Sequence, residues 1–128
     1  AIVLTAVLLS IEQCKYLTSL AHQLGMEVAL KLYTIEEIDY LECDVDLIII
    51  NNRIACSFDM DVNKSFEFAK LLPNDCIKVS EGGIYTPEKA KELSDVGFQG
   101  IIIGDLFMKT ANPGYALGEF IKGIKKEN

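Results

Sequence analysis

The sequence predicts an α/β protein in which five consecutive strand–helix units form one parallel sheet. Apolar runs of strand length alternate strictly with segments whose apolar residues recur at helical spacing. The runs are nearly continuous, as in strands covered on both faces. Because each strand is followed by a helix, neighbouring strands should be parallel and joined by right-handed crossovers. No linker or charge block interrupts residues 1–128, so we expect a single domain.

The first unit begins with the apolar run Ile2–Leu9, which predicts a strand. Ser10 follows as an N-cap, with Gln13 at the capping-box position three residues later. The helix that they open should end at Gly25, because glycine is the preferred residue just past a helix C-terminus.

The second and third units follow the same plan. Val28–Tyr33 predicts a strand, and Thr34 with Glu37 forms a second capping box that opens a helix. Asp46–Asn51 predicts the third strand, and after a loop the next helix is expected over Asp61–Leu72.

The last two units are marked by proline and glycine. Ile77–Ser80 predicts the fourth strand, and Thr86-Pro87 opens a helix with proline at its favoured first position. Gly97 should end that helix. Ile101–Ile103 predicts the fifth strand, and Asn112-Pro113 opens the last helix.

Composition excludes several classes of protein. The net charge of −7 argues against nucleic acid or an anionic membrane surface as partner, and no apolar run is long enough to span a membrane. The four cysteines have neither C-x-x-C nor zinc-ligand spacing, which predicts free thiols and a cytoplasmic protein. The only histidine, His22, falls in a helical pattern and is expected to be structural. We therefore expect no metal and no cofactor.

Two strand ends run into glycine and then into a helix signal. Gly82 and Gly83 follow the fourth strand, and Gly104 with Asp105 follows the fifth. Glycine lets backbone N–H groups approach an anion closely, and a helix N-terminus adds a favourable dipole. These four residues are candidate ligands of a substrate phosphate or of a phosphate ion, although glycine is also common in turns and loops that bind nothing.

Two architectures fit five such units. One is part of a (β/α)8 barrel, which needs about 250 residues when complete and holds phosphate at the ends of its last strands. The other is a flavodoxin-like open sheet, in which the first strand moves inside. Length alone favours the second.

Four segments and the final helix resemble the indole-3-glycerol-phosphate synthases, a family of TIM barrels in tryptophan biosynthesis, especially those of the Bacteroides group. The segments are Ala21–Glu27, Ile50–Arg53, Val79–Ile84 and Ile102–Met108, and Asn112-Pro113-Gly114 fits the last helix. The resemblance covers essentially the whole chain. It implies a partial TIM barrel, a (βα)5 unit that corresponds to the family's fourth to eighth βα units.

The resemblance implies a lyase reaction and several site residues. The family closes an indole ring on 1-(2-carboxyphenylamino)-1-deoxyribulose 5-phosphate with loss of carbon dioxide and water. This chemistry needs a general acid for a carbonyl oxygen and a base for a ring proton. Asn51 and Glu81 match substrate-contacting residues of the family, and Gly83 and Gly104 match its phosphate-binding glycines. Asp105 occupies a position where the family usually has Ser or Glu.

The chain also departs from the family pattern. Lys31 replaces a catalytic Glu at the end of the family's fifth strand, and Gly82 replaces the Ser that follows Glu81. Ile49 replaces a usual Gly, and Ile54 replaces a usual Asp or Asn. The resemblance also implies that the family's catalytic lysines and a first-strand Glu belong to three units that the match does not include. We therefore expect no synthase activity from these residues alone.

A five-unit barrel fragment would expose two apolar edge strands and the former barrel interior. Pairing with a polypeptide that carries the N-terminal units, association into a homo-oligomer, or rearrangement to the flavodoxin-like order would each cover these surfaces. Large apolar residues at Ile49 and Ile54 suggest a further hypothesis, namely that they fill or cover an abandoned active site.

Two other functions are open at this point. The chain could be a non-catalytic or engineered α/β module that retains at most phosphate binding. Lys31 could instead form a Schiff base with a carbonyl substrate in an aldolase-like reaction, with Glu81 as base. The simpler interpretation of Lys31 is that it reaches out of a rearranged sheet into solvent, because a buried unpaired lysine would be costly.

Overall fold

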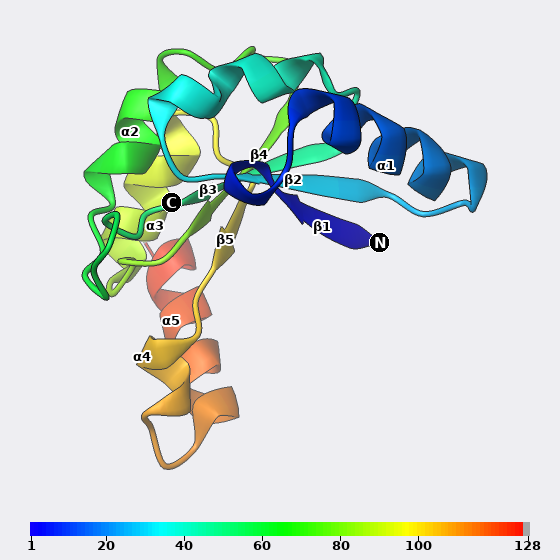
Figure 1. Cartoon of the computed structure of the whole chain (residues 1–128). Helices are drawn as coiled ribbons and strands as arrows, with labels where there is room; N and C mark the ends of the chain where they lie inside the picture. Colours follow the sequence, from blue (N-terminus) through cyan, green and yellow to red (C-terminus); the bar gives the residue numbers. More distant parts are fainter. Residues whose placement is uncertain (127–128) are drawn as a thin grey trace.

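The computed structural model describes residues 1–126 and contains one five-stranded parallel sheet (Figure 1). The strands are β1 (Ile2–Thr5), β2 (Val28–Leu32), β3 (Leu47–Asn51), β4 (Ile77–Glu81) and β5 (Gly100–Ile102). The helical elements are η1 (Ala6–Leu8), α1 (Ile11–Gln23), η2 (Ile35–Glu42), α2 (Asn63–Ala69), α3 (Pro87–Asp95), α4 (Asp105–Met108) and α5 (Pro113–Lys125). The predicted α/β class and its five parallel strands are confirmed.

The strand order is β1-β2-β3-β4-β5, so each strand pairs with the next strand along the chain. This sequential order is that of a barrel segment. The alternative of a flavodoxin-like sheet, with the first strand inside, is therefore wrong, because β1 lies at an edge. Length favoured that alternative, but length carries no information on which strands pair.

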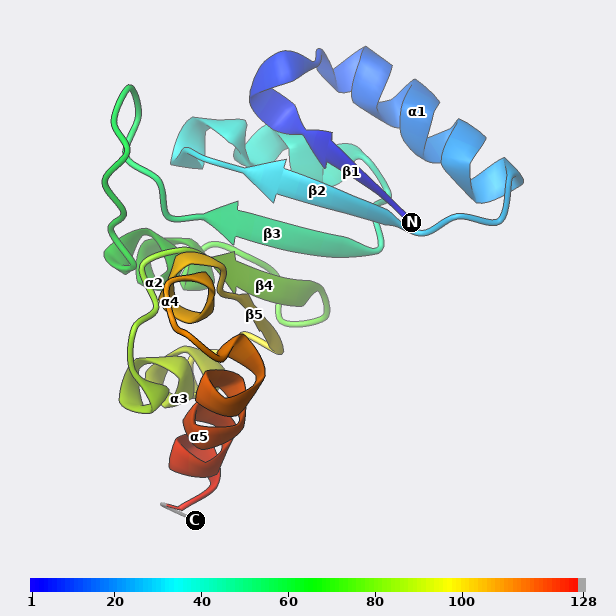
Figure 2. The same ribbon diagram turned by 90° about the horizontal axis from the view of Figure 1, so that it is seen from below.

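The helices cover one side of the curved sheet and leave the other side open (Figures 1 and 2). The core lies between the sheet and this helical layer. Its largest fully buried apolar side chains are Val28, Leu30, Leu32, Ile50, Phe68, Ile84 and Leu93. Because successive side chains of a strand point to opposite faces, every second residue of β2, β3 and β4 points instead to the uncovered, concave face.

Three helix starts are built as the sequence predicts. Ser10 accepts a hydrogen bond from the Gln13 amide, and the Gln13 side chain accepts one from the Ser10 amide. Thr86 caps α3 and Asn112 caps α5, and each helix has proline in its first turn. These caps orient the helices that follow the strand ends.

Two elements differ from their predicted form. β1 ends at Thr5, where its last pairing residue faces Lys31 of β2, and residues 6–8 turn into the 3₁₀ helix η1. An apolar run shows where a strand can form but not where its partner ends. The second predicted helix is the 3₁₀ helix η2, although the Glu37 carboxylate accepts the expected hydrogen bond from the Thr34 amide.

The concave face and both edge strands remain accessible. Val3 in β1 is 56% exposed, Ile77 in β4 is 48% exposed and Ile102 in β5 is 41% exposed. Exposed apolar side chains in parallel strands are unusual, since such sheets are normally covered on both faces. Among the described helices, none has both the length and the apolar character needed to cross a membrane.

Candidate active site at the carboxyl ends of β2, β3 and β4

Three polar side chains meet where neighbouring strands end. Lys31 is the fourth residue of β2, Asn51 is the last residue of β3, and Glu81 is the last residue of β4. Asn51 and Glu81 are register partners, and Lys31 is paired with Ile49 on the same face of the sheet. Strand alternation places all three on the concave face, at the edge where barrel enzymes hold their active sites.

The Glu81 carboxylate is the centre of this cluster. Its Oε2 atom lies 2.8 Å from Lys31 Nζ and 3.3 Å from Asn51 Nδ2, which donates to it. The Asn51 side-chain oxygen accepts a hydrogen bond from the Arg53 amide, and this contact fixes which end of the amide faces Glu81. The side chains of Lys31 and Glu81 are 20% and 24% exposed. The cluster thus places a proton donor, a carboxylate and an orienting amide within reach of a substrate.

The interpretation of Lys31 as a solvated side chain on a rearranged sheet is wrong. The sheet is not rearranged, and Lys31 Nζ forms an ion pair with Glu81. A Schiff base requires an amine with a free lone pair, whereas this geometry engages Lys31 as an ammonium ion. The ion pair therefore favours proton transfer or electrostatic roles for Lys31 over covalent catalysis.

The glycine turn after β4 requires both of its glycines. Gly82 has a φ of +94° and Gly83 a φ of +70°, a region that other residues rarely adopt. A Cβ on Gly82 would lie 2.8 Å from the sulfur of Met60, and one on Gly83 would lie 3.2 Å from the Met60 Cβ. Met60 comes from the loop after β3 and was not singled out by the sequence, because an isolated methionine in a loop carries no pattern.

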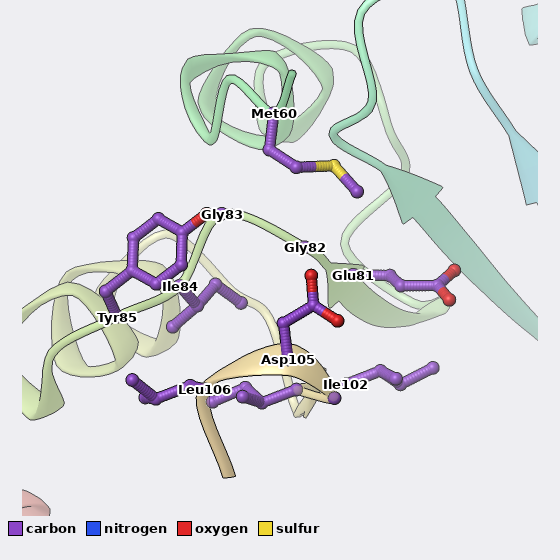
Figure 3. A pocket seen from close by; sticks show the side chains of 11 residues that line it. Met60, Glu81, Gly82, Gly83, Ile84, Tyr85, Ile102, Asp105 and Leu106 are labelled. Atoms are coloured by element: carbon purple, nitrogen blue, oxygen red, sulfur yellow. The ribbon is translucent and has the colours of Figure 1, made fainter. Parts of the chain in front are cut away.

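A cavity of about 200 Å³ opens between the ends of β4 and β5 (Figure 3). Gly82, Gly83, Gly104 and Asp105 all line it, so the structure brings the four phosphate candidates together. The Asp105 carboxylate points toward the glycine turn, whereas the Glu81 carboxylate points away from it. No lysine or arginine is present among the described residues of the lining. A carboxylate so placed weakens the attraction of this cavity for an anion.

Gly104 differs from the other two glycines. Its φ is −111°, and a Cβ there would meet nothing within 4 Å. Neither the backbone nor the local packing requires glycine at this position.

The two isoleucines that replace smaller or polar family residues have different environments. Ile49 is 5% exposed and lies on the concave face beside Lys31, consistent with filling that face. Ile54 is 43% exposed and lies in the loop after β3, close to Phe58. Partial exposure of Ile54 does not decide whether its side chain covers the active site, so that hypothesis stays a prediction.

Several polar residues behind the site were not recognised from the sequence. Asn52, Ser65 and Ser80 are each fully buried and hydrogen-bond to one another. Asn52 was noticed only as part of a motif, and nothing in the sequence connects Ser65 in α2 with Ser80 in β4.

The remaining titratable candidates lie outside the cluster. His22 pairs with Asp46 at 2.8 Å on the helical side, and all four cysteines are free. Hydrogen bonds from the Val28 amide and from His22 lower the pKa of Asp46. Within residues 1–126 no group of His, Cys, Asp and Glu has the arrangement of a metal site.

Comparison with known proteins confirms the family resemblance. Residues 1–120 match the family model described as indole-3-glycerol phosphate synthase. Indole-3-glycerol phosphate synthase of Bacteroides thetaiotaomicron is 45% identical over 125 residues, which are 98% of this chain and 48% of that protein. The enzyme of Lachnoclostridium phytofermentans is 31% identical and matches 87% of this chain and 41% of its own length. The chain thus spans about half the length of these curated relatives.

Solved structures agree with the fold. A 3-hexulose-6-phosphate synthase superposes with a TM-score of 0.76 at 13% identity, covering 95% of this chain and 60% of that one. A structure titled native KDPGal superposes with a TM-score of 0.62 at 19% identity, covering 97% of this chain and 56% of that one. At such identities the likeness shows the fold alone.

Proposed function

Because this chain belongs to the indole-3-glycerol-phosphate synthase family, we propose that Lys31, Asn51 and Glu81 form part of a ring-closing active site. The substrate is the carboxyphenylamino-deoxyribulose phosphate that the family resemblance implies. The convergence of Lys31 and Asn51 on Glu81 Oε2 carries the proposal. We further propose that residues 1–128 do not catalyse this reaction by themselves.

The cluster supplies matched chemical roles. Ring closure requires a proton for the carbonyl oxygen and a base that removes a proton from the ring. In this proposal the Lys31 ammonium donates to the carbonyl oxygen, and the Glu81 carboxylate accepts the ring proton. Asn51 donates to Glu81 and so sets the direction of its carboxylate. The resemblance implies a glutamate where this chain has Lys31, so the proposed acid–base pair differs from the usual family arrangement.

The phosphate end of the substrate is assigned to the cavity between β4 and β5. The turn at Gly82 and Gly83, with Gly104 opposite, offers backbone that a phosphate can approach closely. The Asp105 carboxylate lines the same cavity and opposes this binding, since like charges repel. Phosphate affinity therefore depends on a cation that these residues do not supply.

Incompleteness of the site follows from the same geometry. Lys31 is the only lysine or arginine that β2, β3 and β4 place on the described concave face, and it is already paired with Glu81. The chain spans 48% of its Bacteroides relative, and the family resemblance assigns further catalytic lysines to the part that is not matched. A polypeptide with those units is the proposed partner.

Complementation tests the proposal. The chain is mixed with a separately produced N-terminal half of the Bacteroides thetaiotaomicron enzyme, the substrate is added, and indole fluorescence is recorded. The chain contains no tryptophan, which keeps its own background low. We expect product in the mixture and none from either part alone.

Variants of the chain test whether the indole fluorescence of the mixture depends on the proposed site residues. Glu81→Gln should abolish turnover, and Asp105→Ser should lower the KM because it removes a negative charge from the phosphate cavity. Asp75→Asn, in the exposed turn before β4 at the opposite end of the sheet, should change neither. Absence of product from a mixture that forms a stable complex would instead support a non-catalytic module.

A further inference from the structure

A closed ring of hydrogen bonds lies directly behind the candidate active site. Asn52 Nδ2 donates to Ser80 Oγ at 3.0 Å, Ser65 Oγ donates to Asn52 Oδ1 at 2.8 Å, and the two serine hydroxyls are 2.7 Å apart. All three residues are 0% exposed. Asn52 Nδ2 has a second hydrogen bond, at 2.8 Å, to the carbonyl oxygen of Gly82.

The donor count determines the direction of the ring. Ser65 has one hydroxyl proton, which it gives to Asn52, so the proton between the two serines must come from Ser80. The ring therefore runs from Asn52 to Ser80, from Ser80 to Ser65, and from Ser65 back to Asn52. The second amide proton of Asn52 remains for Gly82. Every side-chain proton in this buried network has an acceptor.

We propose that Asn52, Ser65 and Ser80 are positioning residues that hold Glu81 and the glycine turn in their working geometry. Asn52 follows Asn51, and Ser80 precedes Glu81. The network and the acid–base cluster thus lie on opposite sides of the same two strand ends. The ring joins the ends of β3 and β4 to α2. Through Asn52 it also forms a hydrogen bond with the carbonyl oxygen of Gly82, the residue after Glu81. Its catalytic consequence rests on the proposed function, whereas its structural consequence does not.

Buried rings of this kind are sensitive to small changes. Asn52→Asp has the same shape but no side-chain proton for Ser80 or Gly82, so it breaks both contacts at once. Ser80→Ala breaks the ring but keeps the contact between Asn52 and Gly82. A buried polar atom without a partner costs more than the bond itself contributes, so the strand ends should shift to regain partners. We expect Glu81 to move relative to Lys31 in Asn52→Asp and to move less in Ser80→Ala.

A double-mutant cycle measures that movement in the full chain. The cycle consists of Lys31→Met, Glu81→Gln and the double variant. It is made in three backgrounds, namely the natural sequence, Ser80→Ala and Asn52→Asp. Urea unfolding of each set gives the coupling free energy between Lys31 and Glu81 in that background. We expect the coupling to fall by more than half in Asn52→Asp and by a smaller fraction in Ser80→Ala. A ring that only adds stability would lower all midpoints equally and leave the coupling unchanged, which would overturn the proposal.

Amide hydrogen exchange provides a second, local measurement. Exchange at Gly82 and Gly83, relative to the amides of β2, should rise at least tenfold in Asn52→Asp, which loses the contact with Gly82, and by less in Ser80→Ala. Thr18→Val is the control, because Thr18 is 3% exposed and its hydroxyl oxygen has no hydrogen-bond partner among the described residues. Uniform acceleration throughout the sheet would also contradict a positioning role.

The two proposals fail separately. If the natural mixture with the N-terminal half gives no product but the coupling and exchange respond as expected, the proposed function fails and the ring still positions Glu81. If the mixture is active and Ser80→Ala leaves kcat unchanged, the ring has no positioning role in the reaction. We expect Ser80→Ala to lower kcat with little change in KM, because Glu81 acts in the chemical step.

Discussion

At the level of single residues, Lys31 shows how a charge reversal can be accommodated. An ammonium on the concave face would be costly without a partner, and Glu81 supplies one at 2.8 Å. A lysine at this position is therefore stable only while the strand end of β4 stays in place. Lys31, where the resemblance implies a glutamate, is thus coupled to Glu81, which the resemblance implies to be a family residue.

Cys43 gives a prediction for stability at alkaline pH. Burial, reinforced by a hydrogen bond with the neighbouring thiol of Cys14, raises the pKa of Cys43 from its ordinary value of 9.0 to about 12. Between these two values the unfolded chain has lost the proton that the folded chain keeps, so the unfolded state binds fewer protons and stability falls as pH rises. We expect this loss over about pH 9 to 12, measured by urea unfolding at several pH values.

Substitutions separate Cys43 from the lysines and tyrosines that titrate in the same range. Cys43→Ala should flatten the dependence of unfolding free energy on pH by up to about 1.4 kcal/mol per pH unit. The exposed Cys56 serves as control, and Cys56→Ser should keep the natural slope. An unchanged slope in Cys43→Ala would show that other groups cause the alkaline loss.

The family resemblance is what singled out the site residues in the sequence. It implied roles for Asn51 and Glu81 and marked Lys31 as a departure, and the structure brings the three together because the carboxyl ends of parallel strands meet at one edge of a sheet. Asn52, Ser65 and Ser80 had no such signal, since polar residues of these types are also common in loops and helices. Their contacts exist only once β3, α2 and β4 pack together.

At the level of elements, the turn after β4 is the most constrained connection near the site. Two successive glycines have positive φ, and Met60 packs against both. The turn after β5 has neither constraint at Gly104. The two glycine turns look equivalent in the sequence, but only the turn after β4 needs residues with a positive φ.

Alanine substitution should separate these two turns. Gly82→Ala combines a strained φ with a short contact to the flexible end of Met60, and should cost about 1–2 kcal/mol of unfolding free energy. At Gly25 φ is +75° and an added Cβ would meet no atom within 4 Å. Gly25→Ala therefore measures the cost of the strained backbone alone, which should be about 1 kcal/mol of unfolding free energy. Gly104→Ala should stay within about 0.5 kcal/mol. Thermal or urea unfolding measures these losses of unfolding free energy. Equal losses for Gly82→Ala and Gly104→Ala would contradict the conclusion that only the turn after β4 requires glycine.

Element types were more predictable than element ends. Capping boxes and proline placed the starts of α1, α3 and α5 correctly, because caps are local and chemically specific. The end of β1 and the 3₁₀ form of η2 depend on pairing and packing with distant segments. The strand order could not be derived from length, and only the residues shared with the barrel family indicated it.

At the level of the whole molecule, the sheet is a curved barrel segment with one uncovered face. Its strand order is sequential, and β1 and β5 are both edges. Apolar side chains on this face and at these edges lack the second layer that parallel sheets normally have. Closure by further strands would cover both edges at once.

Association behaviour should reflect this open side. We expect the isolated 128-residue chain to self-associate, because unpaired apolar edges invite pairing. In sedimentation velocity its mean mass should rise with concentration, and the N-terminal half of the Bacteroides relative should convert it into a one-to-one complex.

Val3→Lys with Ile102→Lys should weaken self-association, since both side chains are exposed on the open side. Phe58→Ser removes a side chain that is 90% exposed but lies in the loop after β3, and it should change nothing. A concentration-independent monomer would mean that the open face and both edge strands are stable in water without a partner, which would contradict the expected self-association.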